Sequence, residues 1–109
     1  MKLGHMGRHR RGLVREAGDG ATQVARWDVT NEENDARRRA AHALARLGIA
    51  NVLRLPGWNA VGARCERLLH IELTDFGRTV LSTYERELKS GAKIRWRRLD
   101  GVAMAAVAA

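Results

Sequence analysis

The sequence predicts a small α+β domain in which a helix, a two-stranded hairpin and a second helix follow one another along the chain. Three observations support this prediction. A capped stretch with helical periodicity covers residues 30–47, strand-forming residues flank a turn within residues 49–73, and a second capped helical stretch begins at Thr74. At 109 residues the chain has room for one such domain.

The composition favours a polyanionic partner. Lys and Arg number 20 against 12 Asp and Glu, which gives a net charge of +8, and such an excess is typical of proteins that bind nucleic acid. No apolar run approaches the roughly 20 residues that cross a bilayer, and the start of the chain lacks the apolar stretch of a secretion signal. We therefore expect a cytoplasmic protein without a membrane partner. The single cysteine, Cys65, can form no internal disulfide.

The ends of the chain are predicted to lie outside the folded domain. Residues 1–20 combine five glycines with clustered arginines, which predicts a flexible basic arm that either follows a phosphate backbone or is simply a solvated tail. The domain then covers residues 21–99, with Trp27 as an anchor in its core. A small apolar tail follows at residues 100–109. His5 and His9 lack a third ligand, so no metal site is expected.

The first helix of the domain is predicted to have two different sides. The Thr30 hydroxyl can cap the amide of Glu33, and Gly48 provides the conformation common just past a helix end. At about 100° per residue, small and apolar residues share one side: Ala36, Ala40, Ala43, Leu44 and Leu47. The opposite side holds Arg38, Arg39, His42 and Arg46. A cationic outer face suits the major groove of DNA, although it is often only a solvated surface.

A hairpin and a final helix are predicted after this helix. Residues 49–55 and 69–73 have strand composition, and residues 56–59 with Gly62 have turn composition. Three arginines lie on or beside the hairpin tip, where they could bind phosphates: Arg54, Arg64 and Arg67. Thr74 can cap a helix over residues 75–90 whose apolar stripe would form core or dimer interface. Residues 93–99 alternate basic and apolar side chains, as in an edge strand or a nucleic-acid surface.

Two segments resemble winged-helix transcriptional regulators of the MarR-like kind. Residues 37–49, Arg-Arg-Arg-Ala-Ala-His-Ala-Leu-Ala-Arg-Leu-Gly-Ile, resemble their recognition helix and the following turn, and residues 73–78, Leu-Thr-Asp-Phe-Gly-Arg, are similar to the segment that leaves the wing. The resemblance covers residues 35–81 and implies a winged-helix-like domain with a two-stranded wing and a C-terminal helix. It places Arg37, Arg38, Arg39 and His42 at base edges, and Arg64 and Arg67 in the wing. One departure is that residues 8–29 are too few for the two helices that precede the recognition helix in that family.

The function expected from these features is sequence-selective binding of duplex DNA in transcriptional control, by a homodimer without a cofactor. The expected DNA-binding residues are Arg37, Arg38, Arg39, His42, Arg46, Arg54, Arg64 and Arg67. An enzyme is not expected, because the chain has no glycine-rich phosphate loop and no nucleophile with a recognisable companion. The alternatives are a small phage-type protein that binds an acidic host protein, and an RNA-binding module that uses Trp96 and its flanking arginines.

Overall fold

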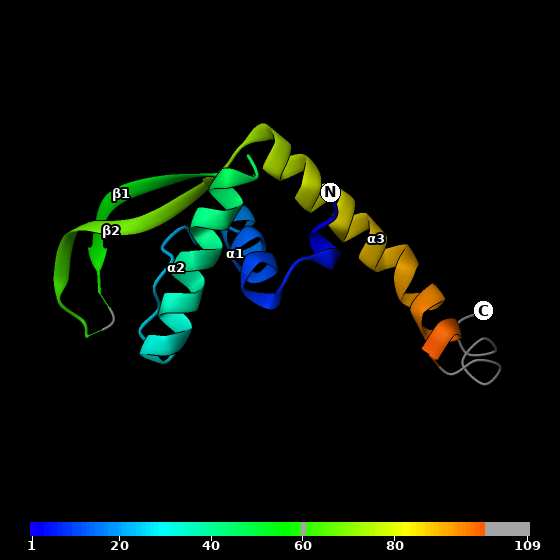
Figure 1. The fold of residues 1–109 in the computed structure, drawn as a ribbon, viewed down its shortest axis with the longest axis horizontal. Coiled ribbons are helices and arrows are strands. Elements are labelled where there is room, and N and C mark those ends of the chain that lie inside the picture. The colour runs from blue at the N-terminus through cyan, green and yellow to red at the C-terminus, as the bar shows by residue number, and fades with distance from the viewer. Residues whose placement is uncertain (60, 100–109) are drawn as a thin grey trace.

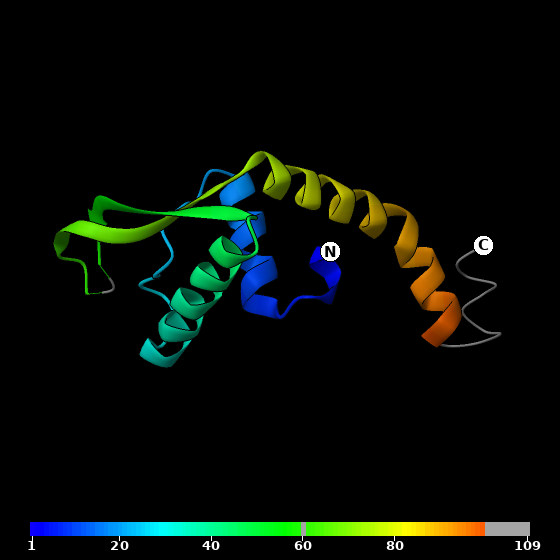
Figure 2. The same cartoon turned by 45° about the horizontal axis from the view of Figure 1, so that its top comes forward.

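The chain folds as a small α+β domain, as the sequence predicts. The computed structural model describes residues 1–59 and 61–99, with side chains up to Ser90. In this part of the chain the elements are a 3-10 turn η1 (Leu3–His5), helix α1 (Arg8–Gly18), helix α2 (Asn31–Arg46), strands β1 (Ala50–Trp58) and β2 (Arg64–Leu73), and helix α3 (Asp75–Leu99). Helices α1 and α2 lie together, and the hairpin and α3 leave this centre in opposite directions (Figures 1 and 2).

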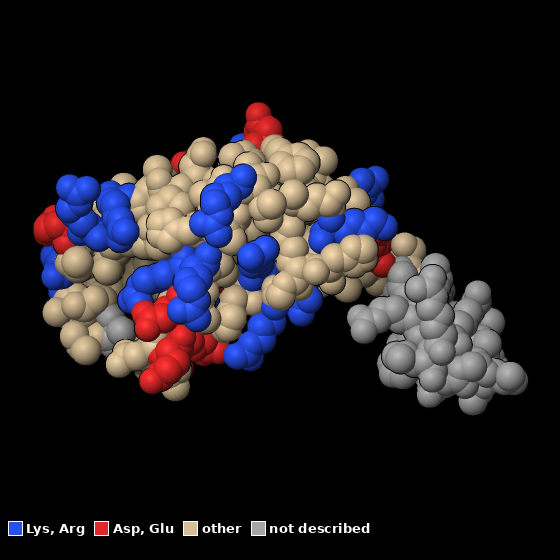
Figure 3. All heavy atoms as spheres, in the orientation of Figure 1, with Lys and Arg blue, Asp and Glu red and all other residues tan. Residues whose placement is uncertain are grey.

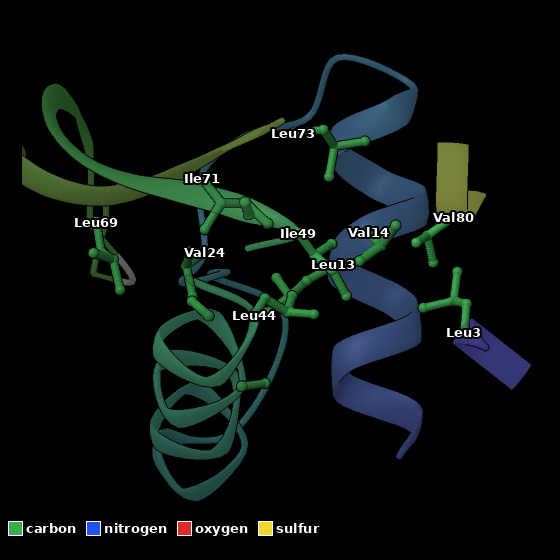
Figure 4. Close-up of a cluster of buried hydrophobic side chains, with 13 residues drawn as sticks. Leu3, Leu13, Val14, Val24, Leu44, Ile49, Leu69, Ile71, Leu73 and Val80 are labelled. Atoms are coloured by element: carbon green, nitrogen blue, oxygen red, sulfur yellow. The ribbon is translucent and has the colours of Figure 1, made fainter. Parts of the chain in front are cut away.

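Residues 1–20 are part of the folded domain, and the prediction of a flexible arm is wrong. Leu3 of η1 and Leu13 and Val14 of α1 are at most 2% exposed and belong to the hydrophobic core (Figure 4). A glycine inside a helix costs about 1 kcal/mol relative to alanine, but most helical stability in proteins comes from tertiary packing of an apolar face. Burial of these three side chains therefore outweighs the local preference for disorder, and the expected boundary after residue 20 does not exist.

Helix α2 has the predicted ends. The Thr30 hydroxyl accepts a hydrogen bond from the Glu33 amide at 3.1 Å, and Gly48 has a φ of +77°, in the left-handed region that favours glycine. The buried side of the helix consists mainly of small residues: Ala40, Ala41, Ala43 and Leu44. Leu47, predicted on this side, is the C-cap residue of the helix and is 36% exposed.

The two strands form an antiparallel hairpin that is longer than predicted. Ala50 pairs with Leu73 and Val52 with Ile71, and the side chains of these pairs share the face toward the core. Residues 56–58, predicted in the turn, are still in β1, where a bulge between Leu55 and Gly57 bends the strand.

A short extended segment covers the outer edge of β2. The Val24 amide donates to the Leu69 carbonyl at 3.0 Å, and the Ile71 amide donates to the Thr22 carbonyl at 2.9 Å. This pairing uses backbone groups that an open edge would leave exposed. The connection between α1 and α2 is thereby fixed to the sheet.

The Leu-Thr-Asp-Phe-Gly motif forms the junction between the hairpin and α3. The Thr74 hydroxyl donates to the Gly48 carbonyl at 2.6 Å and accepts from the Gly77 amide at 2.9 Å. A Cβ atom on Gly77 would collide with the Ile49 carbonyl oxygen. The hydroxyl and the absent side chain together let the start of α3 lie directly against the turn that ends α2.

Helix α3 continues to Leu99, so of the two alternatives for residues 93–99 the edge strand is wrong. Extending a formed helix adds one hydrogen bond for each residue that is ordered, and no proline follows Pro56 to stop it. The helix therefore does not end after residue 90, where the sequence predicts its end. The predicted tail at residues 100–109 lies outside the described residues. None of the described helices has an apolar stretch of the length that a bilayer requires.

Candidate nucleic-acid interface

The outer side of α2 presents basic side chains to solvent, as predicted for four residues. They are Arg38, Arg39, His42 and Arg46. Acidic residues occupy the opening turns of the same helix, where a negative charge complements the helix dipole. Figure 3 shows Asp and Glu atoms gathered at the free end of α2 and Lys and Arg atoms over the rest of that face. The positive charge therefore lies on the part of α2 that is nearer the hairpin.

Arg37 does not belong to this outer face, and its assignment as a base-reading residue is wrong. It is 6% exposed. Its guanidinium donates two hydrogen bonds to the Glu16 carboxylate, at 2.7 and 3.1 Å, and one to the Val24 carbonyl at 2.6 Å. Arg37 thus joins α2 to α1 and to the segment on the edge of β2. Its neighbour Arg38 points outward and pairs with Asp35 at 2.7 Å, with both side chains largely exposed.

A concave surface between α1 and α2, which we call the basic hollow, gathers arginines from both helices. It has a volume of about 410 Å³. Its lining consists of Gly7, Arg8, His9, Arg10, Ala36, Arg39, Ala40, Ala43 and Arg46. No acidic residue is among them. The alanines on α2 are small, which leaves the space between the two helices open.

The arginines of the basic hollow are only partly neutralised. Arg8 pairs with Glu33 at 3.2 Å, and the Arg8 side chain is 75% exposed. Among the described side chains, no carboxylate forms an ion pair with Arg10, Arg39 or Arg46. Like charges held close together raise the local potential, which favours the entry of an anion.

The hairpin carries three more exposed arginines, as predicted, but they are spread along it. Arg54 lies opposite Leu69 in the middle of the sheet, and Arg64 lies opposite Trp58 near the end. Arg64 pairs with Glu66 at 3.3 Å in an exposed ion pair, which is worth little in water and can exchange for a phosphate. Arg67 is exposed on β2. In Figure 3, Lys and Arg atoms are also gathered over the hairpin.

The prediction from sequence missed Arg8, His9 and Arg10 as ordered members of this surface. The sequence predicts a helical turn near Leu13 to Ala17, and the spacing of Leu13, Val14 and Ala17 is that of a longer helix with one apolar side. A helix over these residues would have placed the preceding arginines at a fixed end instead of on a mobile arm.

Both tryptophans of the described side chains lie outside the core. Trp27, predicted as a core anchor, is 80% exposed, and Trp58 is 61% exposed. The prediction for Trp27 is wrong because Val24, three residues earlier, fills the core position at 0% exposure.

Comparison with protein-family models, with curated protein sequences and with solved structures gives no match to this chain.

Proposed function

We propose that this protein binds duplex DNA and acts in transcriptional control. The observation that supports this most strongly is the basic hollow, where Arg8 and Arg10 of α1 meet Arg39 and Arg46 of α2 without an acidic residue in the lining. A site with this charge is suited to a phosphate group, and phosphate contacts provide most of the affinity of proteins for DNA. The exposed arginines of the hairpin extend the same charge to a second contact region.

We further propose that the domain is a reduced winged helix, in which α2 is the recognition helix and the hairpin is the wing. One helix, α1, precedes α2 in the described chain, where the resembling family has two. The Asn34 side chain supplies part of the missing support, because it accepts from the Arg26 amide at 2.8 Å and donates to the Arg26 carbonyl at 2.9 Å. These bonds and those of Arg37 fix the short connection on which α2 rests.

The basic side chains then fall into two groups with different tasks. The arginines of the basic hollow and of the hairpin bind phosphates, which positions the protein but conveys no sequence information. Arg38 and His42, on the outer side of α2, read base edges in the major groove. An arginine that donates two hydrogen bonds to guanine discriminates by about 1–3 kcal/mol.

We propose a homodimer formed through α3. Val80 and Tyr84 pack on the core and on α1 and η1, and Leu88 continues their stripe by one helical turn with 37% exposure. The helix runs on beyond the rest of the domain (Figure 1). Val80 and Tyr84 are already covered within the chain, so a second copy would cover the exposed end of the stripe at Leu88. Light scattering should give twice the chain mass for the wild type and a shift toward the monomer for Leu88→Glu.

Fluorescence polarisation with a labelled duplex tests the proposed function. Wild-type protein should bind, and affinity should fall steeply as salt rises from about 50 to 200 mM, because bound counterions are released from the phosphates. The double variant Arg39→Ala with Arg46→Ala should lose at least about tenfold in affinity. Arg86→Ala is the matched control, since Arg86 is an exposed arginine on α3, away from the basic hollow.

Two outcomes would contradict the proposal. No binding to any duplex at low salt, together with salt-resistant binding to an acidic protein, would indicate the protein-binding alternative. Tighter binding to single-stranded RNA than to duplex DNA would indicate the RNA-binding alternative.

A further inference from the structure

A second hollow is lined by both exposed tryptophans. It lies between residues 21–28 and the outer part of the hairpin, and we call it the tryptophan hollow. Its volume is about 460 Å³, within the range of roughly 300–1,000 Å³ that is usual for small-molecule sites. Trp27 and Trp58 both line it, although they come from separate segments of the chain. Exposed aromatic surface that converges on a concavity indicates a binding site more than a packing accident.

One side chain holds the two tryptophan segments in place. The Gln23 amide nitrogen donates to the Trp58 carbonyl at 2.7 Å and to the Ala25 carbonyl at 3.1 Å. Gly57 allows this approach, because a Cβ atom there would lie 2.8 Å from the Gln23 Oε1 atom. The Trp58 backbone is therefore joined to Ala25, two residues before Trp27, before any ligand binds, which lowers the entropy cost of binding.

The charged groups of the tryptophan hollow are already paired with one another. The Arg26 guanidinium donates to both carboxylate oxygens of Asp28, at 2.8 and 2.7 Å, and lies 3.8 Å from Glu16. The hydrogen bond from Arg26 lowers the pKa of the Asp28 carboxyl below its usual range, so this carboxyl stays ionised and paired. The Glu16 carboxylate is in turn held by Arg37. An uncharged ligand fits this balance better than an ion does.

A polar group without a partner completes the lining. His70 is 9% exposed, and its Nδ1 atom is hydrogen-bonded to the Thr22 hydroxyl at 2.9 Å. Its Nε2 atom is buried and has no hydrogen-bond partner among the described residues. An unsatisfied buried nitrogen costs about 1–3 kcal/mol. A ligand that reached it through a small shift of the lining would recover part of this cost.

We propose that the tryptophan hollow binds a planar, uncharged heteroaromatic ring of the nucleobase type, stacked on Trp27 and Trp58 with a polar edge toward His70. Indole rings stack well on nucleobases whatever the base, and the bases carry hydrogen-bonding groups along their edges. The ring belongs to a free nucleoside or to an unpaired nucleotide of a nucleic acid. This site shares no lining residue with the basic hollow, so the inference does not depend on duplex DNA binding.

Tryptophan fluorescence tests this inference directly. In full-length Trp96→Phe protein, only Trp27 and Trp58 emit, and titration with adenosine, guanosine, cytidine or thymidine should quench them saturably. Trp27→Ala and Trp58→Ala, each in that background, should weaken binding by about tenfold or more, with the remaining tryptophan as reporter. Trp27→Phe and Trp58→Phe keep an aromatic face and should retain part of the affinity. Val61→Ala is the control, since Val61 is 87% exposed near the hairpin tip and does not line the hollow.

A parallel titration with a single-stranded trinucleotide separates the two sources of the ring. Saturation by nucleosides indicates a free ligand, and saturation by the trinucleotide alone indicates an unpaired base; both support the site. Absence of saturable quenching by every probe overturns the proposal, as does quenching that is unchanged in both alanine variants. Circular dichroism of each variant verifies folding, and the phenylalanine variants decide the result if an alanine variant does not fold.

Discussion

Arg37 is the residue whose removal should harm folding most among the arginines of α2. Loss of one partner from a buried ion pair costs about 3–5 kcal/mol, and Glu16 is 26% exposed, so we expect Arg37→Ala to lower the free energy of unfolding by about 3 kcal/mol. Arg38→Ala removes an exposed pair and should change it by less than about 1 kcal/mol. Urea unfolding of the two variants measures the difference. Equal effects would show that the Glu16 pair contributes no more than a surface ion pair.

These two neighbours also show the limit of prediction from the sequence. Arg37, Arg38 and Arg39 are chemically identical and consecutive, and helical periodicity alone places Arg37 at the border between the two sides of α2. What makes it internal is Glu16, which α1 brings into contact from 21 residues away. Arg38, Arg39, His42 and Arg46 were correctly predicted as exposed because their positions depend only on the local period.

His70 should make stability depend on pH. Burial lowers its pKa in the folded protein below the ordinary value of about 6.5. The unfolded chain therefore takes up a proton first as pH falls. Stability is then complete above about pH 6.5 and declines below it, which urea unfolding at a series of pH values from about 7.5 to 5 can follow. His70→Phe should flatten the decline, whereas His42→Ala, at an exposed position, should leave it. If the free energy of unfolding of His70→Phe still declines at low pH, the pH dependence arises from other groups.

The junction at the start of α3 predicts opposite effects for two glycine substitutions. A Cβ atom on Gly77 would meet the Ile49 carbonyl, and the backbone cannot move without breaking the Thr74 bonds, so Gly77→Ala should cost about 2 kcal/mol or more. A Cβ atom on Gly12 in α1 would make only an ordinary van der Waals contact, at 3.7 Å from the Glu16 Oε2 atom. Gly12→Ala should therefore add about 0.5–1 kcal/mol. Thermal melting of both variants tests the pair, and a stable Gly77→Ala would mean that α3 is not held against this turn.

The elements with strong local signals were predicted, and those that depend on packing were not. Helix α2 and helix α3 each begin at a threonine cap. The two strands have a suitable composition, so the sequence predicts both helices and the hairpin. Helix α1 buries only Leu13 and Val14 among its own residues. Two buried positions are too weak a helical pattern to predict a helix in a segment rich in glycine and arginine. The basic hollow could not be predicted for the same reason, because the start of α1 forms one of its two walls.

In the proposed complex with DNA, the distribution of charge separates affinity from specificity. The net charge of +8 draws the protein to any polyanion. Among the described side chains, arginines gather in the basic hollow, on the outer side of α2 and along the hairpin, whereas the start of α2 is acidic. A duplex that contacts all three would meet phosphate-binding groups on each side of Arg38 and His42. In this proposed complex, nonspecific attraction and base reading depend on different side chains.

Two variants should separate these contributions in DNA binding. Arg10→Gln removes a charge from the basic hollow, so it should weaken binding equally on preferred and random duplexes and reduce the slope of log affinity against log salt by about 1. Arg38→Ala with His42→Ala should instead reduce the preference between the two duplexes by about 1–3 kcal/mol. Selection from a random DNA pool supplies the preferred sequence, and polarisation titrations at several salt concentrations give both quantities. Equal losses on both duplexes for the Arg38 and His42 variant would exclude base reading by α2 and leave only phosphate binding.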